Sequence, residues 1–156
     1  SIYYLARLIE GGESAEFIAR RLVILASEDI GNANPQALTL TTSAMTSVSK
    51  IGYPEARIIL AQAVIYLCAS PKSNSAYTAI NQALKSVQNG KLLDIPTNIT
   101  QNHEGYLYPH DFGGYVKQDY LLEPLKFVKL KEIGYEKKMK EWIEILKESV
   151  KNSVSF

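Results

Sequence analysis

His110 and Asp111 form the adjacent pair in this chain whose residue types best suit general acid–base chemistry. A carboxylate can orient an imidazole as a base, and Tyr108 or Tyr115 would then supply a proton or a hydrogen bond. Adjacent residues seldom point the same way, however, and no local signature places a serine or cysteine nucleophile beside them. The alternative is a turn at residues 109–111, in which Asp111 bonds nearby backbone N–H groups. We favour the turn and assign no catalytic residue.

The sequence lacks the common motifs for phosphate and metal binding. Neither Gly-Gly pair, at residues 11–12 and 113–114, is followed by the Lys-Ser/Thr that holds phosphate and magnesium in a phosphate-binding loop. The two histidines, His103 and His110, and the single cysteine do not have the spacing of a zinc site. We therefore expect no cofactor site and no metal site within this chain.

Two adjacent arginines suit binding to an anionic partner. The planar guanidinium groups of Arg20 and Arg21 can grip a phosphate or a carboxylate through two hydrogen bonds. In the alternative interpretation, which we favour, they pair with Glu16, Glu28 or Asp29 and stabilise the fold.

Tyrosines gather between Tyr106 and Tyr120, where four of the ten in the chain occur. Aromatic faces next to basic groups can stack on the bases of single-stranded nucleic acid, which makes Tyr106, Tyr108 and Tyr115 candidate contacts. The acidic residues nearby cancel the few lysines, so we favour tyrosines that pack an irregular segment onto helices and leave the hydroxyl group solvated.

The composition fits one globular domain of 156 residues, with 46% hydrophobic and 21% charged residues. A net charge of +1 lacks the electrostatic footprint of an autonomous nucleic-acid binder. The lone cysteine, Cys68, favours a reducing compartment. The longest apolar run, residues 58–69, is too short to cross a bilayer. Because the sequence starts at Ser1 and enters a helical pattern at once, we expect a piece of a longer chain.

Helical periodicity with sharp breaks dominates residues 1–90. Apolar residues recur three or four positions apart in five segments, which glycine or proline separates. Ser14, Asn34 and Ser73 are the expected N-caps of the second, third and fifth segments. Because the connections are short, we predict antiparallel neighbours. The fold class is therefore all-α, with an antiparallel helical bundle of about five helices at residues 1–90.

The third and fourth helical segments differ in character. The third has a small, hydroxylated side, on which Thr42 and Thr46 are candidate interface residues. The fourth, after Pro54, is apolar almost all round, which is typical of the central helix of a bundle.

The remaining sequence divides into two parts. Residues 91–134 carry three prolines and little periodicity, which predicts a long irregular Tyr/Pro-rich strap packed on the bundle. Residues 135–156 predict a C-terminal amphipathic helix and tail. The apolar face of this helix comprises Met139, Trp142, Ile143, Leu146 and Val150.

Several runs, taken in order, resemble the C-terminal region of the RarA (MgsA) family of AAA+ ATPases. They cover nearly the whole chain. The runs are residues 4–13 (YLARLIEGGE), 17–22 (FIARRL), 26–31 (ASEDIG), 34–38 (NPQAL), 52–56 (GYPEA), 60–67 (LAQAVIYL), 70–74 (SPKSN), 106–111 (YLYPHD) and 114–116 (GYV). The chain departs from the family at residues 97–104, where members usually carry a basic stretch, and at residues 127–134.

This resemblance implies a function that the residues alone do not. The family is related to clamp loaders and includes the Werner-helicase-interacting protein. Its members resemble one another in having an N-terminal ATPase module, which binds ATP and magnesium, and a helical C-terminal region that assembles tetramers. By resemblance, this chain is the non-catalytic, tetramer-forming part of a cytoplasmic, nucleoid-associated protein. The resemblance also implies DNA as a partner of the whole assembly, a partnership with single-strand DNA-binding protein, and roles in replication-fork maintenance and recombination.

Two surfaces are candidate subunit interfaces: the hydroxylated side of the third segment and the Tyr-rich strap, which includes His110 and Asp111. The alternative function is a DNA-contacting module of the same ATPase, which a steep fall of DNA affinity with salt would reveal.

Overall fold

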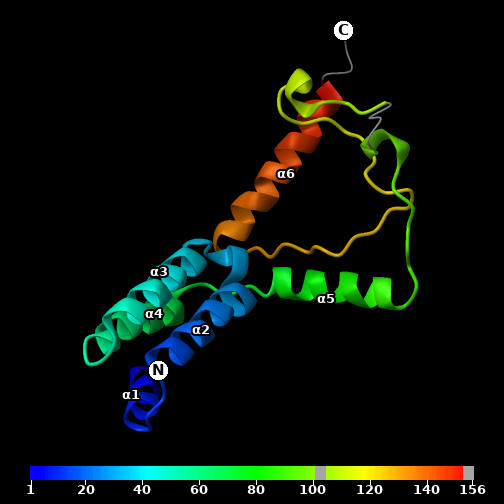
Figure 1. Cartoon of the computed structure of the whole chain (residues 1–156). Coiled ribbons are helices and arrows are strands. Elements are labelled where there is room, and N and C mark those ends of the chain that lie inside the picture. The colour runs from blue at the N-terminus through cyan, green and yellow to red at the C-terminus, as the bar shows by residue number, and fades with distance from the viewer. Residues whose placement is uncertain (101–104, 153–156) are drawn as a thin grey trace. The chain divides into compact units, whose positions relative to one another are not determined.

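The computed structural model describes residues 1–100 and 105–152, with side chains up to residue 148 (Figure 1). Within these residues the secondary structure is helical and contains no strand, so the all-α prediction is confirmed. The α-helices are α1 (Ile2–Glu10), α2 (Ala15–Leu25), α3 (Gln36–Ile51), α4 (Ala56–Ala69), α5 (Ser75–Gln88) and α6 (Gly134–Asn152). Short helical turns are η1 (Ala26–Ile30), η2 (Gly31–Ala33), η3 (Thr97–Ile99) and η4 (Pro109–Phe112).

The chain forms two compact units. The first unit consists of Ser1–Ala79 together with Val128–Lys137, and the second consists of Ile80–Phe127 together with the residues from Lys138 onward. Helices α5 and α6 each run from one unit into the other. The boundaries expected at residues 90 and 134, and the packing of the strap on the bundle, stay predictions.

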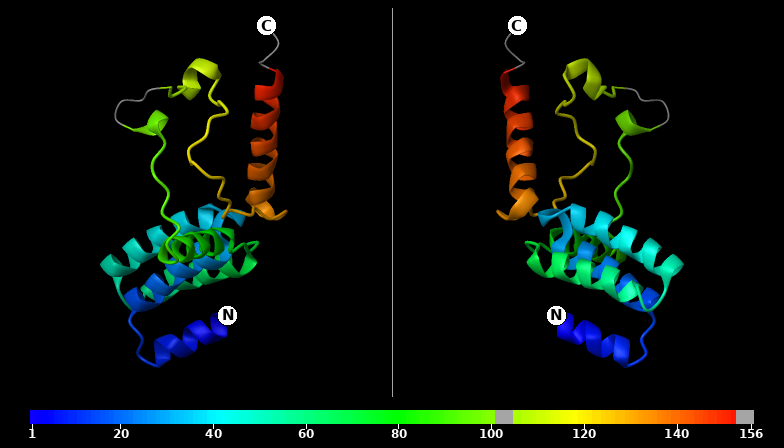
Figure 2. Two further views of the ribbon diagram at one scale, coloured as in Figure 1. Left: turned by 90° about the vertical axis from the view of Figure 1, so that its right-hand side faces the viewer. Right: turned by 90° about the vertical axis from the view of Figure 1, so that its left-hand side faces the viewer.

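The core of the first unit lies where α1 and α2 meet α4 and α3. Figure 2 shows α2, α3 and α4 side by side, and α1 packs against α4. Val48 and Leu60 are fully buried there, and alanines on α2 and α4 let the helices approach closely. Each fully buried aliphatic side chain contributes about 1.5–3 kcal/mol, so this cluster is the main source of stability for the first unit.

Helix α4 is less enclosed than its sequence predicts. Leu60, Ala63 and Leu67 are buried, but Ile58 and Ile65 are 62% and 57% exposed. Helix α4 does pack against α1, α2 and α3, as expected of the central helix of the bundle, but these contacts bury one face of it only.

The cap predictions had different outcomes. Ser14 accepts a hydrogen bond from the backbone N–H of Phe17 at 3.1 Å, as an N-cap does. Asn34, in contrast, does not cap α3 with its side chain. Its amide group donates instead to the hydroxyl oxygen atoms of Tyr66 at 2.9 Å and Ser70 at 3.1 Å. The cap prediction for Asn34 is wrong because contacts with α4 engage its side chain.

Candidate interaction surfaces

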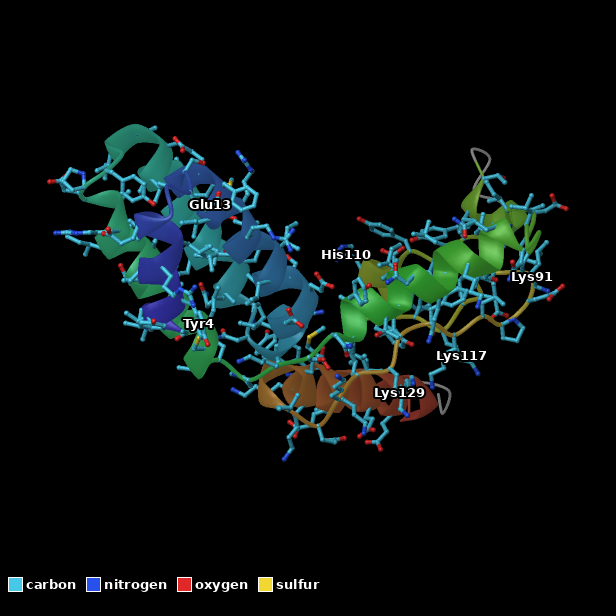
Figure 3. The ribbon with its side chains drawn as sticks, turned by 90° about the horizontal axis from the view of Figure 1, so that it is seen from below. Tyr4, Glu13, Lys91, His110, Lys117 and Lys129 are labelled. Carbon is cyan, nitrogen blue, oxygen red and sulfur yellow. The ribbon has the colours of Figure 1, made fainter. Side chains whose placement is uncertain are left out.

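An apolar groove lies between α1, α2 and α4 in the first unit. Its cavity volume is about 310 Å³. We call it the α1–α2–α4 groove, and its lining residues are Ser1, Tyr4, Leu5, Leu8, Phe17, Ile18, Arg21, Leu22, Leu25, Val64, Leu67, Cys68 and Lys72. Tyr4 is labelled on α1 in Figure 3, and Glu13 marks the turn between α1 and α2. The groove is open because Leu8 and Phe17 stay 45% and 42% exposed.

The charges along this groove have one sign. Its lining includes two cationic residues, Arg21 and Lys72, and no carboxylate. The ammonium group of Lys72 donates to the carbonyl oxygen atoms of Leu67 and Ser70, at 3.2 and 3.0 Å, and so stabilises the end of α4. Within the described part of the chain, Arg21 forms no ion pair. Arg21 is therefore the cation of the groove that is available to an anionic partner.

A second apolar surface runs along α5. Ile80, Leu84 and Val87 share one side of this helix, and each is at least half exposed, at 55%, 50% and 53%. We call these three residues the α5 apolar face. The buried residues of α5 are Ser75 and Ala79, near its start. The stripe that periodicity predicts is thus present, but the described chain leaves it uncovered.

The tyrosine-rich part of the second unit is held together by polar contacts. The Gln118 side chain accepts from the backbone N–H of Leu107 at 3.1 Å and donates to its carbonyl oxygen at 2.8 Å. The rings of Tyr108 and His110 lie 5.1 Å apart between centroids. Partial desolvation raises the pKa of Tyr106, and the neighbouring Tyr120 raises that pKa further.

The turn expected at residues 109–111 is confirmed as η4, but within the described residues the Asp111 carboxylate accepts no hydrogen bond from a backbone N–H. The backbone N–H of Asp111 donates to the carbonyl oxygen of Tyr108 at 3.0 Å and closes this turn. His110, which is labelled in Figure 3, is exposed, and its ring packs against that of Tyr108. Tyr115 is half-buried in the same unit. His103, the other candidate histidine, lies outside the described residues.

The other candidate residues belong to the first unit. Arg20 and Arg21 are both exposed on α2, and neither forms the expected ion pair within the described residues. Thr42 and Thr46 are exposed on α3, and the Thr46 hydroxyl donates to the Thr42 carbonyl oxygen at 3.1 Å. The structure therefore places the nine candidates in two groups: Arg20, Arg21, Thr42 and Thr46 in the first unit, and Tyr106, Tyr108, His110, Asp111 and Tyr115 in the second.

A buried polar anchor escaped the sequence analysis. Glu136, which is fully buried, accepts hydrogen bonds from the Ser75 hydroxyl and, at 2.8 Å, from the backbone N–H of Lys131. The Lys131 ammonium group also donates to the Asn74 side-chain oxygen at 2.7 Å. These bonds fix residues 128–137 to the start of α5, within the first unit.

Glu136→Ala is expected to lower the free energy of unfolding by roughly 2–4 kcal/mol, because it leaves the donors of Ser75 and Lys131 without a partner. Glu136→Gln is expected to retain most of the stability, since an amide oxygen can accept from Lys131 while the amide N–H donates to Ser75. Urea unfolding measures both variants, with Glu10→Ala at an exposed position of α1 as the control. Equal unfolding midpoints for Glu136→Ala and the wild type would refute the anchor.

The structure provides two further findings on binding. Among the described residues no group of three or more His, Cys, Asp and Glu side chains is arranged to hold a metal ion. No helix within that part of the chain has the length and apolar character needed to span a membrane.

Comparison with known protein families defines the class of this protein: it is a helical C-terminal region of an AAA+ ATPase. Residues 1–147 match the family described as MgsA AAA+ ATPase C terminal, and the chain belongs to that family. The resemblance to the RarA (MgsA) family is thereby confirmed.

Relatives of this chain occur in bacteria and in a eukaryote. The chain is 46% identical over 148 residues to Replication-associated recombination protein A of Bacillus subtilis (strain 168), an alignment that covers 86% of this chain and 35% of that relative. It is 34% identical over 169 residues to the Haemophilus influenzae protein of the same name, with coverage of 99% and 38%. It is also 34% identical over 136 residues to ATPase WRNIP1 of Dictyostelium discoideum, with coverage of 80% and 16%. The chain thus spans at most 38% of the length of each of these three relatives.

Proposed function

We propose that this chain is the subunit-assembly domain of an AAA+ ATPase that acts in replication-associated recombination. In this proposal the domain holds four copies together and performs no catalysis itself. Family membership and the names of the relatives support the assignment to an AAA+ ATPase of replication-associated recombination. ATP and magnesium then belong to the remainder of the longer protein.

The observation that carries the assembly role is the α5 apolar face. Apolar side chains that lie side by side and stay exposed on a folded chain usually mark an interaction surface. The charged residue of α5 is Lys85, which lies on another side of the helix from Ile80, Leu84 and Val87. An uncharged apolar stripe is complementary to a copy of itself, which suits a two-fold interface between identical chains.

Assembly of this kind has a direct consequence for an AAA+ motor. Active sites of this class of ATPase lie at subunit boundaries, so holding neighbours together raises the effective concentration of each boundary. A domain distant from the nucleotide can therefore support ATP hydrolysis through cohesion alone.

We expect the 156-residue chain to be a tetramer at micromolar concentration. Multi-angle light scattering coupled to size-exclusion chromatography measures this directly as a molar mass of about four times that of the monomer, whose mass is 17.4 kDa. A single monomeric peak across this concentration range would refute the proposal.

The alternative function is a DNA-contacting module, and the exposed Tyr108 and His110 rings favour it. A measurement of fork-DNA affinity against salt concentration separates the two functions. A DNA contact gives a steep fall in affinity as salt is raised, whereas an assembly domain gives almost no binding at any salt concentration.

Three further proposals rest on the family resemblance. The assembled protein contacts DNA, it has single-strand DNA-binding protein as a partner, and it works in the cytoplasm in association with the nucleoid.

A further inference from the structure

We propose that the α1–α2–α4 groove receives the acidic side of α6 from a second copy of this chain. This inference rests on the proposed assembly function and names a contact that would build the assembly. It is independent of the α5 apolar face, which belongs to a different helix.

The groove supplies the receiving surface. Its floor is formed by side chains such as Leu22, Val64 and Leu67, and its exposed walls by Leu8 and Phe17. An exposed aliphatic side chain that enters a groove of about 310 Å³ replaces contact with water by apolar contact. The preferred occupant therefore presents a protruding apolar residue.

Helix α6 presents such a residue beside three carboxylates that lie on one side of it around the helix. Ile145 is 61% exposed, which makes it the most exposed of the large apolar side chains described on α6. At 100° per residue, Glu141, Glu144 and Glu148 all lie within about 100° of Ile145 around the helix. The apolar stripe of α6, with Met139 and Leu146, lies on another side. We call Ile145 with these three glutamates the α6 acidic face.

The two surfaces are complementary in both polarity and charge. Ile145 would enter the apolar groove, while the carboxylates on one side of it would meet Arg21, which forms no ion pair within the described chain. No carboxylate lines the groove to repel them. Opposite charges at the rim of an interface fix its register and favour the correct partner.

A second copy is the occupant that these observations favour. Each copy carries both surfaces, so in a pair of copies the α6 acidic face of each can bind the α1–α2–α4 groove of the other. A tetramer made from two dimers needs two different kinds of interface. The α5 apolar face supplies one kind, and the contact between α6 and the groove supplies the other.

The position of the single cysteine makes this contact directly testable. Cys68 is exposed and lines the groove, and it is the only cysteine in the chain. Ile145→Cys would place a second thiol on the α6 acidic face. Under mild oxidation we expect a disulfide between Cys68 and position 145 of another copy, seen as a dimer band on a non-reducing gel. Mixing the wild type with an Ile145→Cys, Cys68→Ser variant should give the same band.

Lys147→Cys is the matched control, because Lys147 is exposed on α6 and lies about 160° around the helix from Ile145. A dimer band with Ile145→Cys and none with Lys147→Cys supports the inference. Equal bands for both variants, no band at all, or a disulfide that closes within one chain at monomer mass would each overturn it.

Charge reversal gives a second readout. Arg21→Glu is expected to weaken association about tenfold, and Glu144→Arg in the same chain is expected to restore part of that loss. Light scattering on the same samples separates the two levels of the proposal. A tetramer without the disulfide at position 145 would overturn only this contact, whereas a monomeric wild type would overturn the assembly function as well.

Discussion

A chain that carries Ile80→Glu and Leu84→Glu is expected to lose the tetrameric state, with association across the α5 apolar face weakened about 100-fold or more. Both side chains are at least half exposed on α5, so the substitutions create no cavity in the described chain. Glutamate is also a good helix former, so α5 itself should persist. Where the α5 helices of two copies pack together, however, the new carboxylates would be buried without a partner, which is strongly unfavourable.

The matched control for this double substitution is Thr78→Glu with Gln82→Glu. Both residues are exposed, lie four positions apart and occupy the side of α5 opposite Ile80 and Leu84. Light scattering should show a dimer, held by the contact between α6 and the groove, for the first pair and an unchanged tetramer for the control pair, with equal helical signals by circular dichroism. An unchanged oligomer in both would mean that the α5 apolar face is not an interface.

The α5 apolar face also illustrates what a sequence can and cannot specify. A period of 3.6 residues predicts that Ile80, Leu84 and Val87 share a side of the helix, and the structure agrees. The pattern does not state which surface covers that side. A stripe packed in its own core and a stripe kept for a partner have the same periodicity, so only the exposed fractions distinguish them.

Local hydrogen bonds were predictable for a related reason. Ser14 bonds a backbone group three residues away, so the neighbouring sequence contains all the information needed. Asn34 bonds Tyr66 and Ser70, which lie 32 and 36 residues further along the chain. The choice between a cap and such a distant partner depends on helix packing, which periodicity alone does not determine.

The same limit applies to the candidate surfaces. Residue types drew attention to His110, Asp111 and the tyrosines, and the predicted turn is present. The α1–α2–α4 groove requires α1, α2 and α4 to be placed together in space, and its lining residues are ordinary core types in the sequence. Glu136 is separated from Ser75 by 61 positions, so nothing near it in the sequence distinguished it from an exposed glutamate.

Gly134→Ala is expected to destabilise the first unit strongly, by roughly 3 kcal/mol or more. Gly134 has a φ of +53°, and a Cβ atom there would lie 2.2 Å from the Ala33 carbonyl oxygen and 3.0 Å from Pro71 Cγ. Because the first neighbour is backbone, the clash is relieved only if residues 128–137 move away from η2. That movement would also strain the Glu136 anchor next to it.

Gly12→Ala separates the clash from backbone strain. Gly12 also has a positive φ, of +87°, but a Cβ atom there would have no neighbour within 4 Å. Its substitution should therefore cost only about 1 kcal/mol, from the left-handed backbone alone. Urea unfolding followed by circular dichroism measures both variants. If Gly134→Ala costs no more than Gly12→Ala, residues 128–137 do not pack closely on the first unit, and the returning segment is not a fixed part of its fold.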